Sequence, residues 1–358
     1  MRFYWVVLIG GAFVTIDQPR AATAATEPSK TPSISKTSST NAPSADSIEK
    51  EIQEIMDEDD TAHAEVDKWI RENQAFAEKG AGVSDAELTR RILTRVEPIK
   101  TRYEDFIRRY PNNAKARVAY GSFLNDLHDE EGAVTQWEKG RELNPNDPAV
   151  WNNLANFYGH DGEVKKAFAF YTKAIELNTN EPIYYHNFGT TVFLFRKDAK
   201  EYYGITEQDV FNKALELYAK SLKLDPTNFP LASDVAQTYY GIKPFRADEA
   251  LRAWTNTLAI AHDEIEREGV YIHLARCKLI VERFDEARRH VNAVTNEMYA
   301  SLKSRLTKNL NEQEKAAKEK KAAGATDVPN SKLQTPAAET PNPKPQAPEK
   351  SQGPSSKR

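Results

Sequence analysis

The sequence predicts an all-α protein made of stacked helical pairs, with disordered segments at both ends. Large and small residues recur in the same order at an interval of 34 positions, so that Gly121 and Trp137 correspond to Ala155 and Tyr171. An interval of this size is typical of architectures in which each unit contacts only its neighbours. Both ends of the chain are instead rich in Ser, Thr, Pro, Ala and Lys and show no apolar periodicity.

Each unit contains two amphipathic helices. The apolar stripe on the first helix of the second unit consists of Trp151, Leu154, Ala155 and Tyr158. These residues fall at i, i+3, i+4 and i+7, which places them on one helical face. Ala155 and Ala167 are small where the two helices approach, since a larger side chain there would overpack at a cost of roughly 1–3 kcal/mol.

This order of residues resembles the tetratricopeptide repeat. The residues that carry the resemblance are Tyr120, Gly121, Leu124, Ala133, Trp137 and Pro145 in one unit, and Trp151, Leu154, Ala155, Tyr158, Ala167, Tyr171 and Ala174 in the next. The resemblance implies antiparallel helix pairs stacked into a right-handed superhelical solenoid. In that family such solenoids are scaffolds for protein–protein contact, so the resemblance implies binding rather than catalysis.

The same frame extends in both directions along the chain. The third unit has 13 surplus residues between Phe195 and Ala214, and the fourth has two extra residues near Pro244. The predicted organisation is a signal peptide at 1–24, a disordered linker at 25–45, an N-terminal helical region with a capping half-repeat at 46–113, repeats at 114–147, 148–181, 182–228, 229–267 and 268–301, a capping helix at 298–323 and a disordered Pro/Lys-rich tail at 324–358.

The N-terminus predicts export. Arg2 precedes an apolar run from Phe3 to Ile16, and Ala22-Thr23-Ala24 provides a cleavage site of the A-x-A kind. The alternative is an uncleaved anchor, but the run is short against the roughly 20 residues that span a bilayer. We therefore expect no stable membrane anchor after cleavage. The periplasm or cell envelope of a bacterium is the expected location, with the extracellular space as the alternative.

The helix expected after Asp46 has an acidic side. Its members are Glu51, Glu54, Asp57, Glu58, Asp59 and Asp60. Two interpretations stay open: a docking patch for a basic partner, or an ordinary solvated face. Farther along, Pro98 is expected to kink or split the next helix, since proline removes a backbone hydrogen bond.

Composition excludes several function classes. A net charge of −4 provides no basic face for nucleic acid. The single cysteine, Cys277, rules out an intramolecular disulfide and is expected to be a buried, inert thiol. His273 and Cys277 lie at i, i+4, but two ligands do not make a zinc site. No phosphate loop, nucleophile elbow or carboxylate pair is present, so no cofactor, no metal and no enzymatic activity are expected.

The partner-binding surface is expected on the concave side of the first helices. The predicted groove residues are Asn152, Asn156, His186, Asn187, Thr190, Phe193, Gln237 and Tyr240. Amides suit an extended peptide backbone, and Phe193 and Tyr240 are expected to be apolar anchors. The alternative is that the asparagines only support turns between helices. Tyr202 and Tyr203 in the insertion are predicted as an exposed contact at the rim.

Some members of the family hold a C-terminal carboxylate with two asparagines and several basic residues. Asn156 and Asn187 stand at the asparagine positions, whereas the basic positions hold Asn152, Pro230 and Asp234. No carboxylate clamp is expected, because Asp234 would repel the ligand.

The sequence thus predicts a non-enzymatic scaffold or adaptor that binds a protein or peptide partner in the periplasm or cell envelope. Two alternatives stay open. One is a structural or assembly subunit of an envelope complex, and the other is a carbohydrate-binding accessory protein of a secreted enzyme system.

Overall fold

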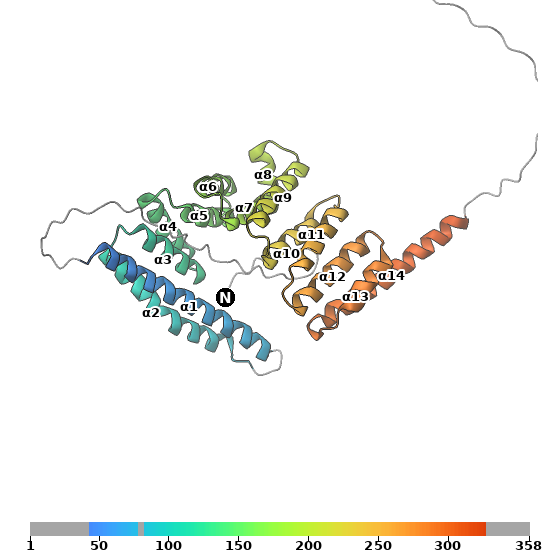
Figure 1. Ribbon diagram of the computed structural model, residues 1–358, viewed down its shortest axis with the longest axis horizontal. Coiled ribbons are helices and arrows are strands. Elements are labelled where there is room, and N and C mark those ends of the chain that lie inside the picture. The colour runs from blue at the N-terminus through green and yellow to red at the C-terminus, as the bar shows by residue number, and fades with distance from the viewer. Residues whose placement is uncertain (1–42, 78–81, 327–358) are drawn as a thin grey trace, which may run out of the picture. The chain divides into compact units, whose positions relative to one another are not determined.

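The computed structural model describes residues 43–77 and 82–326, and every regular element in these ranges is a helix (Figure 1). The helices are α1 (Ala45–Ala77), α2 (Asp85–Arg109), α3 (Ala114–Asp126), α4 (Glu130–Leu143), α5 (Pro148–His160), α6 (Val164–Leu177), α7 (Pro182–Leu194), α8 (Arg196–Tyr203), α9 (Glu207–Leu224), α10 (Phe229–Thr238), α11 (Ala247–Ala259), α12 (Glu264–Ile280), α13 (Phe284–Ala293) and α14 (Ala300–Thr326), with 3-10 turns η1 (Tyr239–Gly241) and η2 (Glu297–Tyr299). The all-α prediction is confirmed. The predicted signal peptide lies outside the described residues, as does most of the predicted linker and C-terminal tail.

Helices α3 to α13 form five pairs that follow one another along the chain. The pairs are α3/α4, α5/α6, α7/α9, α10/α11 and α12/α13. Small residues on the first helix of a pair admit the large aromatic residue of the second. A β-carbon on Gly189 would lie 2.9 Å from Cε1 of Tyr218, so only glycine fits beneath that ring without a shift. Ala155 and Ala167 are fully buried at the corresponding contact in the α5/α6 pair.

Capping side chains set where the first helices begin. Asn113, Asp147, Asn228 and Asp263 precede α3, α5, α10 and α12, and each side chain accepts a hydrogen bond from a backbone N–H of the first turn. Such caps satisfy donors that have no partner within the helix and stabilise it by about 1 kcal/mol. Because the caps recur with the repeat, the helices start in register.

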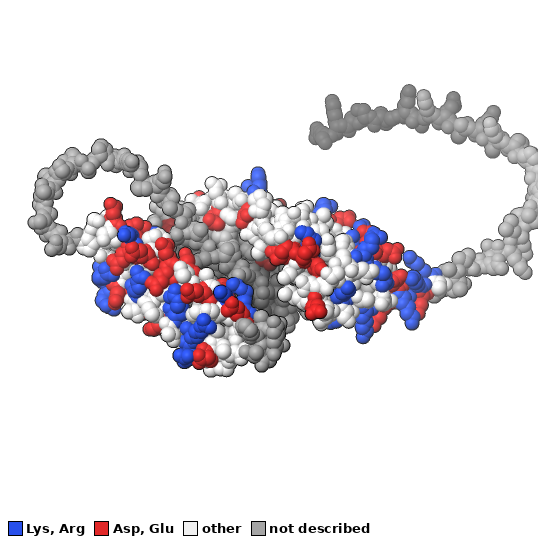
Figure 2. Space-filling view, turned by 60° about the horizontal axis from the view of Figure 1, so that its bottom comes forward, with Lys and Arg blue, Asp and Glu red and all other residues white. Residues whose placement is uncertain are grey.

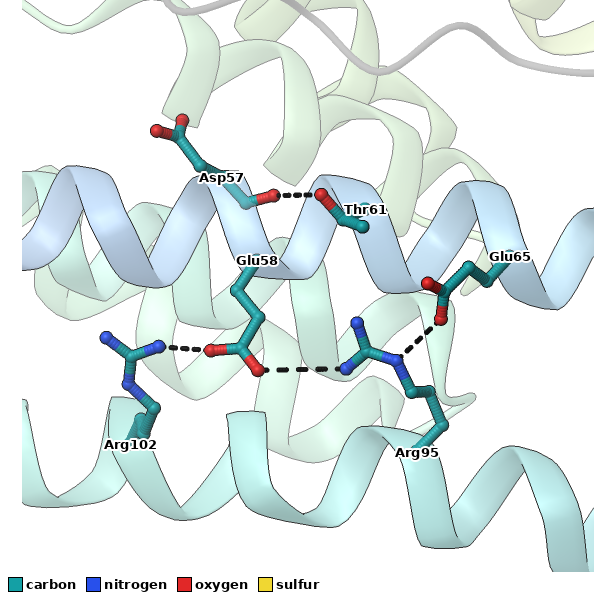
Figure 3. Close-up of polar contacts among 6 residues, drawn as sticks. All are labelled: Asp57, Glu58, Thr61, Glu65, Arg95 and Arg102. Atoms are coloured by element: carbon teal, nitrogen blue, oxygen red, sulfur yellow. Dashed lines mark hydrogen bonds and ion pairs between the residues drawn. The ribbon is translucent and has the colours of Figure 1, made fainter.

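Helices α1 and α2 form an antiparallel hairpin that is joined along one edge by ion pairs. The pairs are Glu51–Arg109, Glu58–Arg102 and Glu65–Arg95. Successive pairs are seven residues apart on both helices, so they stay on the same edge as in a coiled coil. Figure 3 shows the centre of this edge, where Glu58 lies between Arg102 and Arg95.

These contacts decide between the two interpretations of the acidic side of α1. Glu51 and Glu58 pair with α2, and the Tyr103 hydroxyl donates to Oδ2 of Asp59 at 3.0 Å in the interior. Glu54, Asp57 and Asp60 are exposed. A continuous docking patch from Glu51 to Asp60 is therefore not present, because half of its carboxylates stabilise the hairpin.

Pro98 does not split α2, which runs from Asp85 to Arg109 without interruption. Val96 and Ile99, on either side of the proline, are buried, and Arg95 and Arg102 hold the same segment to α1. A proline inside a helix costs roughly 3 kcal/mol. Packing against α1 offsets that cost and keeps the helix continuous.

The insertion in the third pair folds as a short helix rather than projecting as a loop. Ala199 of α8 is fully buried, and the Tyr203 ring stacks on Phe168 of α6 with centroids 5.7 Å apart. The prediction that both tyrosines lie exposed at the rim is wrong for Tyr203, because Phe168 covers it. Tyr202 is 43% exposed and also contacts Phe168. Thr206 caps α9 through a capping box with Asp209.

The C-terminal part begins with a carboxylate that fixes the chain after α13. Glu268 of α12 is buried and accepts hydrogen bonds from the Thr295 hydroxyl and from the backbone N–H groups of Thr295 and Asn296. Helix α14 starts at Ala300, so Met298 belongs to η2 and is exposed rather than part of the predicted capping stripe. By its contacts the chain divides into Met1–Thr307 and Lys308–Arg358. No helix within residues 43–77 and 82–326 has both the length and the apolarity to cross a bilayer.

Candidate functional site on the inner face

The predicted groove residues all lie on α5, α7, α10 and η1, the first helices of three consecutive pairs and the turn that extends the third. We call the surface formed by α5, α7 and α10 the inner face. Successive first helices contact one another, since α5 packs on both α3 and α7. The stack thereby brings residues that are one repeat apart in sequence next to each other in space.

Three of the predicted polar residues form a buried group at the centre of this face. Asn152 of α5 is 2% exposed, and His186 and Asn187 of α7 are 6% and 3% exposed. Nδ2 of Asn187 donates to Oδ1 of Asn152 at 3.2 Å, which joins two repeats. The expectation that these side chains are open to solvent is wrong, because neighbouring helices enclose them.

The same group has polar atoms that are buried without a hydrogen-bond partner. They are Nε2 of His186 and Oδ1 of Asn187. The carboxylate of Asp234 on α10 lies 3.5 Å from Nε2 of His186, and the side chain of Asp234 is itself largely buried. The Tyr218 ring of α9 borders the imidazole, with centroids 5.8 Å apart.

Two other predicted groove residues are held by tyrosines of their own repeat. Oδ1 of Asn156 accepts a hydrogen bond from the Tyr171 hydroxyl at 2.5 Å, and Oγ1 of Thr190 accepts one from the Tyr218 hydroxyl at 3.1 Å. Desolvation by burial raises the pKa of Tyr218 to about 12, so this hydroxyl stays a donor. Asn156 and Thr190 thus lock the two helices of a pair together, which resembles the structural alternative more than a ligand contact.

The two predicted aromatic anchors differ in their surroundings. Phe193 is 5% exposed, lies 6.0 Å from Phe211 between ring centroids, and its Cζ would be 2.5 Å from a β-carbon placed on Gly241. It is a core residue, and the prediction that it is an accessible anchor is wrong because α9 and η1 cover it. Gln237 is half-buried on α10.

Tyr240 is half-buried and belongs to a polar cluster of the last two pairs. Its hydroxyl lies 3.2 Å from Nδ1 of His273 and accepts a hydrogen bond from Sγ of Cys277 at 3.5 Å. His273 stacks on Trp254 at 4.0 Å, and desolvation lowers the pKa of His273 to about 3. Cys277 is fully buried and desolvation raises its pKa, as expected for an inert thiol. Within the described ranges no three His, Cys, Asp or Glu side chains come together as a metal site would require.

Asp234 is the functional candidate that sequence reasoning did not include among the groove residues. It was recognised only as a residue that would repel a carboxylate ligand. The signal was present in the sequence: α5, α7 and α10 contain neither Lys nor Arg, and Asp234 is their one acidic residue. The locking tyrosines Tyr171 and Tyr218 were assigned only to the core stripe.

Comparison with known proteins places this architecture. Residues 137–169 match the tetratricopeptide repeat family. The chain is 28% identical over 119 residues to TPR repeat-containing protein MJ1428 of Methanocaldococcus jannaschii, a stretch that is 33% of this chain. The matched part spans only 17% of the length of that relative.

Several solved structures are similar to this chain. One is YrrB, described as a TPR protein with an unusual peptide-binding site, at 13% identity over 57% of this chain and 97% of YrrB, with a TM-score of 0.44. Another is PilW, described as a type IV pilus biogenesis factor, at 13% identity over 68% of this chain and 98% of PilW, with a TM-score of 0.48. The repeat match at residues 137–169 and the stacked helical pairs identify the chain as an all-α solenoid that contains tetratricopeptide repeat sequence, an architecture of protein-interaction scaffolds.

Proposed function

We propose that this chain is an exported, non-enzymatic scaffold that holds an extended segment of a partner protein against the inner face. The observation that supports the proposal is the pair of buried polar atoms without partners, Nε2 of His186 and Oδ1 of Asn187. A buried polar group left unsatisfied costs about 1–3 kcal/mol. Hydrogen bonds from a bound segment would recover this free energy, which gives the site a reason to bind.

The spacing of the inner-face polar groups favours an extended occupant. Asn152, Asn187 and Asp234 lie on three consecutive first helices. Packed helices are about 8–10 Å apart, and an extended chain advances about 3.3 Å per residue. One polar group per helix therefore matches roughly every third residue of an extended segment.

Export is the second part of the proposal, and it is supported by the sequence of residues 1–24. A fusion of residues 1–45 to alkaline phosphatase, which is active only after export, tests it in a bacterial host. Phosphatase activity is expected, and activity should disappear when Arg is introduced into the apolar run at Val7 and Leu8. An inactive fusion of normal abundance would contradict export.

The binding surface can be tested by site-specific photo-crosslinking in the full chain. A benzophenone amino acid at Gln237 places the reactive group on the half-buried inner face of α10, and the same residue at Lys220 places it on the exposed surface of α9. We expect a discrete adduct with a partner protein from Gln237 and none from Lys220. Adducts of equal yield from both positions, or from Lys220 alone, would contradict an inner-face site.

A further inference from the structure

The inner face carries almost no charge, and the charge it carries has one sign. Helices α5, α7 and α10 together contain no Lys and no Arg, and their only acidic residue is Asp234. The flanking first helices are different, since α3 and α12 carry charged residues of both signs. A single carboxylate at the centre of a neutral surface dominates the local electrostatic potential.

That carboxylate is poorly compensated within the protein. Asp234 is largely buried, and the charged or titratable neighbour that faces it is the His186 imidazole at 3.5 Å. The contact does not satisfy Nε2 of His186 as a hydrogen bond. A carboxylate removed from water is costly unless it is paired and hydrogen-bonded.

The unsatisfied atoms around Asp234 are also suited to accept hydrogen bonds. Oδ1 of Asn187 is an acceptor, because Nδ2 of the same amide is used by Asn152. Nε2 of His186 is an acceptor when the imidazole proton is on Nδ1. With the carboxylate, these atoms form a set of acceptors contributed by α7 and α10.

We propose that this set is a specificity pocket for a cationic side chain, lysine or arginine, of the segment held on the inner face. The inference rests on the proposed function and adds the chemistry of the partner. An ammonium or guanidinium group brings only donors and a positive charge, so it can bond to Asp234, Asn187 and His186 together. Charge-assisted hydrogen bonds of this kind are about twice as strong as neutral ones.

The pocket disfavours the other ligand classes that an amide-lined face would accept. A carboxylate or phosphate would meet Asp234 with no Lys or Arg on the three helices to offset the repulsion. A neutral side chain would leave the buried carboxylate without a counter-ion. Recognition of one basic residue therefore separates this inner face from a general peptide groove.

The test compares short, otherwise identical neutral peptides that carry arginine, lysine, citrulline or norleucine at one central position. Citrulline has the shape of arginine without its charge, and norleucine has the length of lysine without its amine. Binding to the full-length chain is measured by fluorescence anisotropy over randomised flanking residues. We expect the arginine and lysine peptides to bind about tenfold or more tightly than their neutral counterparts, a difference of about 1.4 kcal/mol.

The variant Asp234→Asn should abolish this preference while leaving the affinity for the neutral peptides unchanged. Asp248→Asn is the matched control, because Asp248 lies on α11 with its side chain 80% exposed. If wild-type chain binds all four peptides equally, the cationic pocket is wrong although peptide binding stands. If it binds none of them, the proposed function fails as well. The wild-type comparison of arginine with citrulline remains decisive even if Asp234→Asn does not fold.

Discussion

A β-carbon placed on Gly121 would lie 2.5 Å from Cδ1 of the Trp137 indole. The indole is buried and donates from Nε1 to the carbonyl of Val118 at 3.2 Å, so its position is fixed on both sides. This contact shows why the repeat alternates small and large residues. The small residue of the first helix is the seat of the large residue of the second.

The variant Gly121→Ala is therefore expected to destabilise the chain. The indole cannot move away without losing its hydrogen bond, and overpacking of this kind costs about 1–3 kcal/mol. Gly159→Ala is the matched control, since its β-carbon would meet Thr191 and Ala167 at ordinary distances of 3.5 and 3.7 Å. Alanine is the better helix former by about 0.5–1 kcal/mol, so urea denaturation should show opposite signs for the two variants. Equal destabilisation would contradict this account.

Phe193→Ala should lower stability as a core substitution rather than weaken binding alone. Phe193 is enclosed by Phe211 and η1, and truncating a buried phenylalanine costs about 3–5 kcal/mol. Tyr202→Ala on α8 should cost far less, because that ring is substantially exposed. Thermal unfolding followed by circular dichroism measures both. A Phe193→Ala chain that melts like the wild type would return this residue to the surface.

The edge of the α1–α2 hairpin predicts a salt-sensitive contribution to stability. Glu58→Gln removes a carboxylate that serves both Arg102 and Arg95, although all three side chains are partly exposed. Because solvent screens the pairs, we expect a loss of only about 0.5–1 kcal/mol, shrinking at high salt. Glu54→Gln is the control, as Glu54 pairs only with Lys50 on the same helix at 3.8 Å. A larger effect at Glu54, or none at Glu58 in dilute buffer, would show that the edge contributes nothing.

Glu268 predicts a pH dependence with a defined sign. Hydrogen bonds from the Thr295 hydroxyl and then from the Asn296 N–H lower the pKa of this carboxyl below its usual value of 4.5. Because the folded pKa is the lower one, the unfolded chain takes up the proton first as pH falls. The stabilisation is therefore fully present above the usual value and is lost as pH falls toward the folded pKa.

Glu268→Gln should accordingly destabilise the chain near neutral pH, and its difference from the wild type should narrow in acid. Urea denaturation of both proteins across this range measures the difference. Glu286→Gln is a useful comparison, since its carboxyl is also lowered in pKa, but by Lys278 at 3.0 Å on the surface. A difference between Glu268→Gln and wild type that does not change with pH would mean that the carboxylate charge plays no part.

Much of the fold could be predicted from the sequence because the repeat is encoded locally. Residues such as Gly121, Ala155 and Trp137 announce a helix pair within a few turns of chain. The antiparallel hairpin also left a signal that went unread, since Glu51, Glu58 and Glu65 share the seven-residue spacing of Arg95, Arg102 and Arg109. The packing of Tyr203 could not be predicted in this way, because its partner Phe168 belongs to another repeat.

The inner face was predictable in position but not in exposure. Helical spacing places Asn152, His186 and Phe193 next to the core stripe, yet burial there depends on how closely neighbouring pairs approach. Phe193 is covered by the η1 turn of the next pair, which no periodicity in α7 indicates. The value of Asp234 emerged only when the stack brought α10 beside α7.

The most direct test of the inner-face site is a map of side-chain amide resonances on binding. The partner segment captured at Gln237 would be synthesised and titrated into the labelled full-length chain, with the NH₂ groups of Asn152 and Asn187 followed by NMR. Binding at the proposed site should shift these two groups most, together with backbone amides of α5, α7 and α10. Unchanged Asn152 and Asn187 resonances, with shifts confined to α6, α9 and α11, would contradict the central claim.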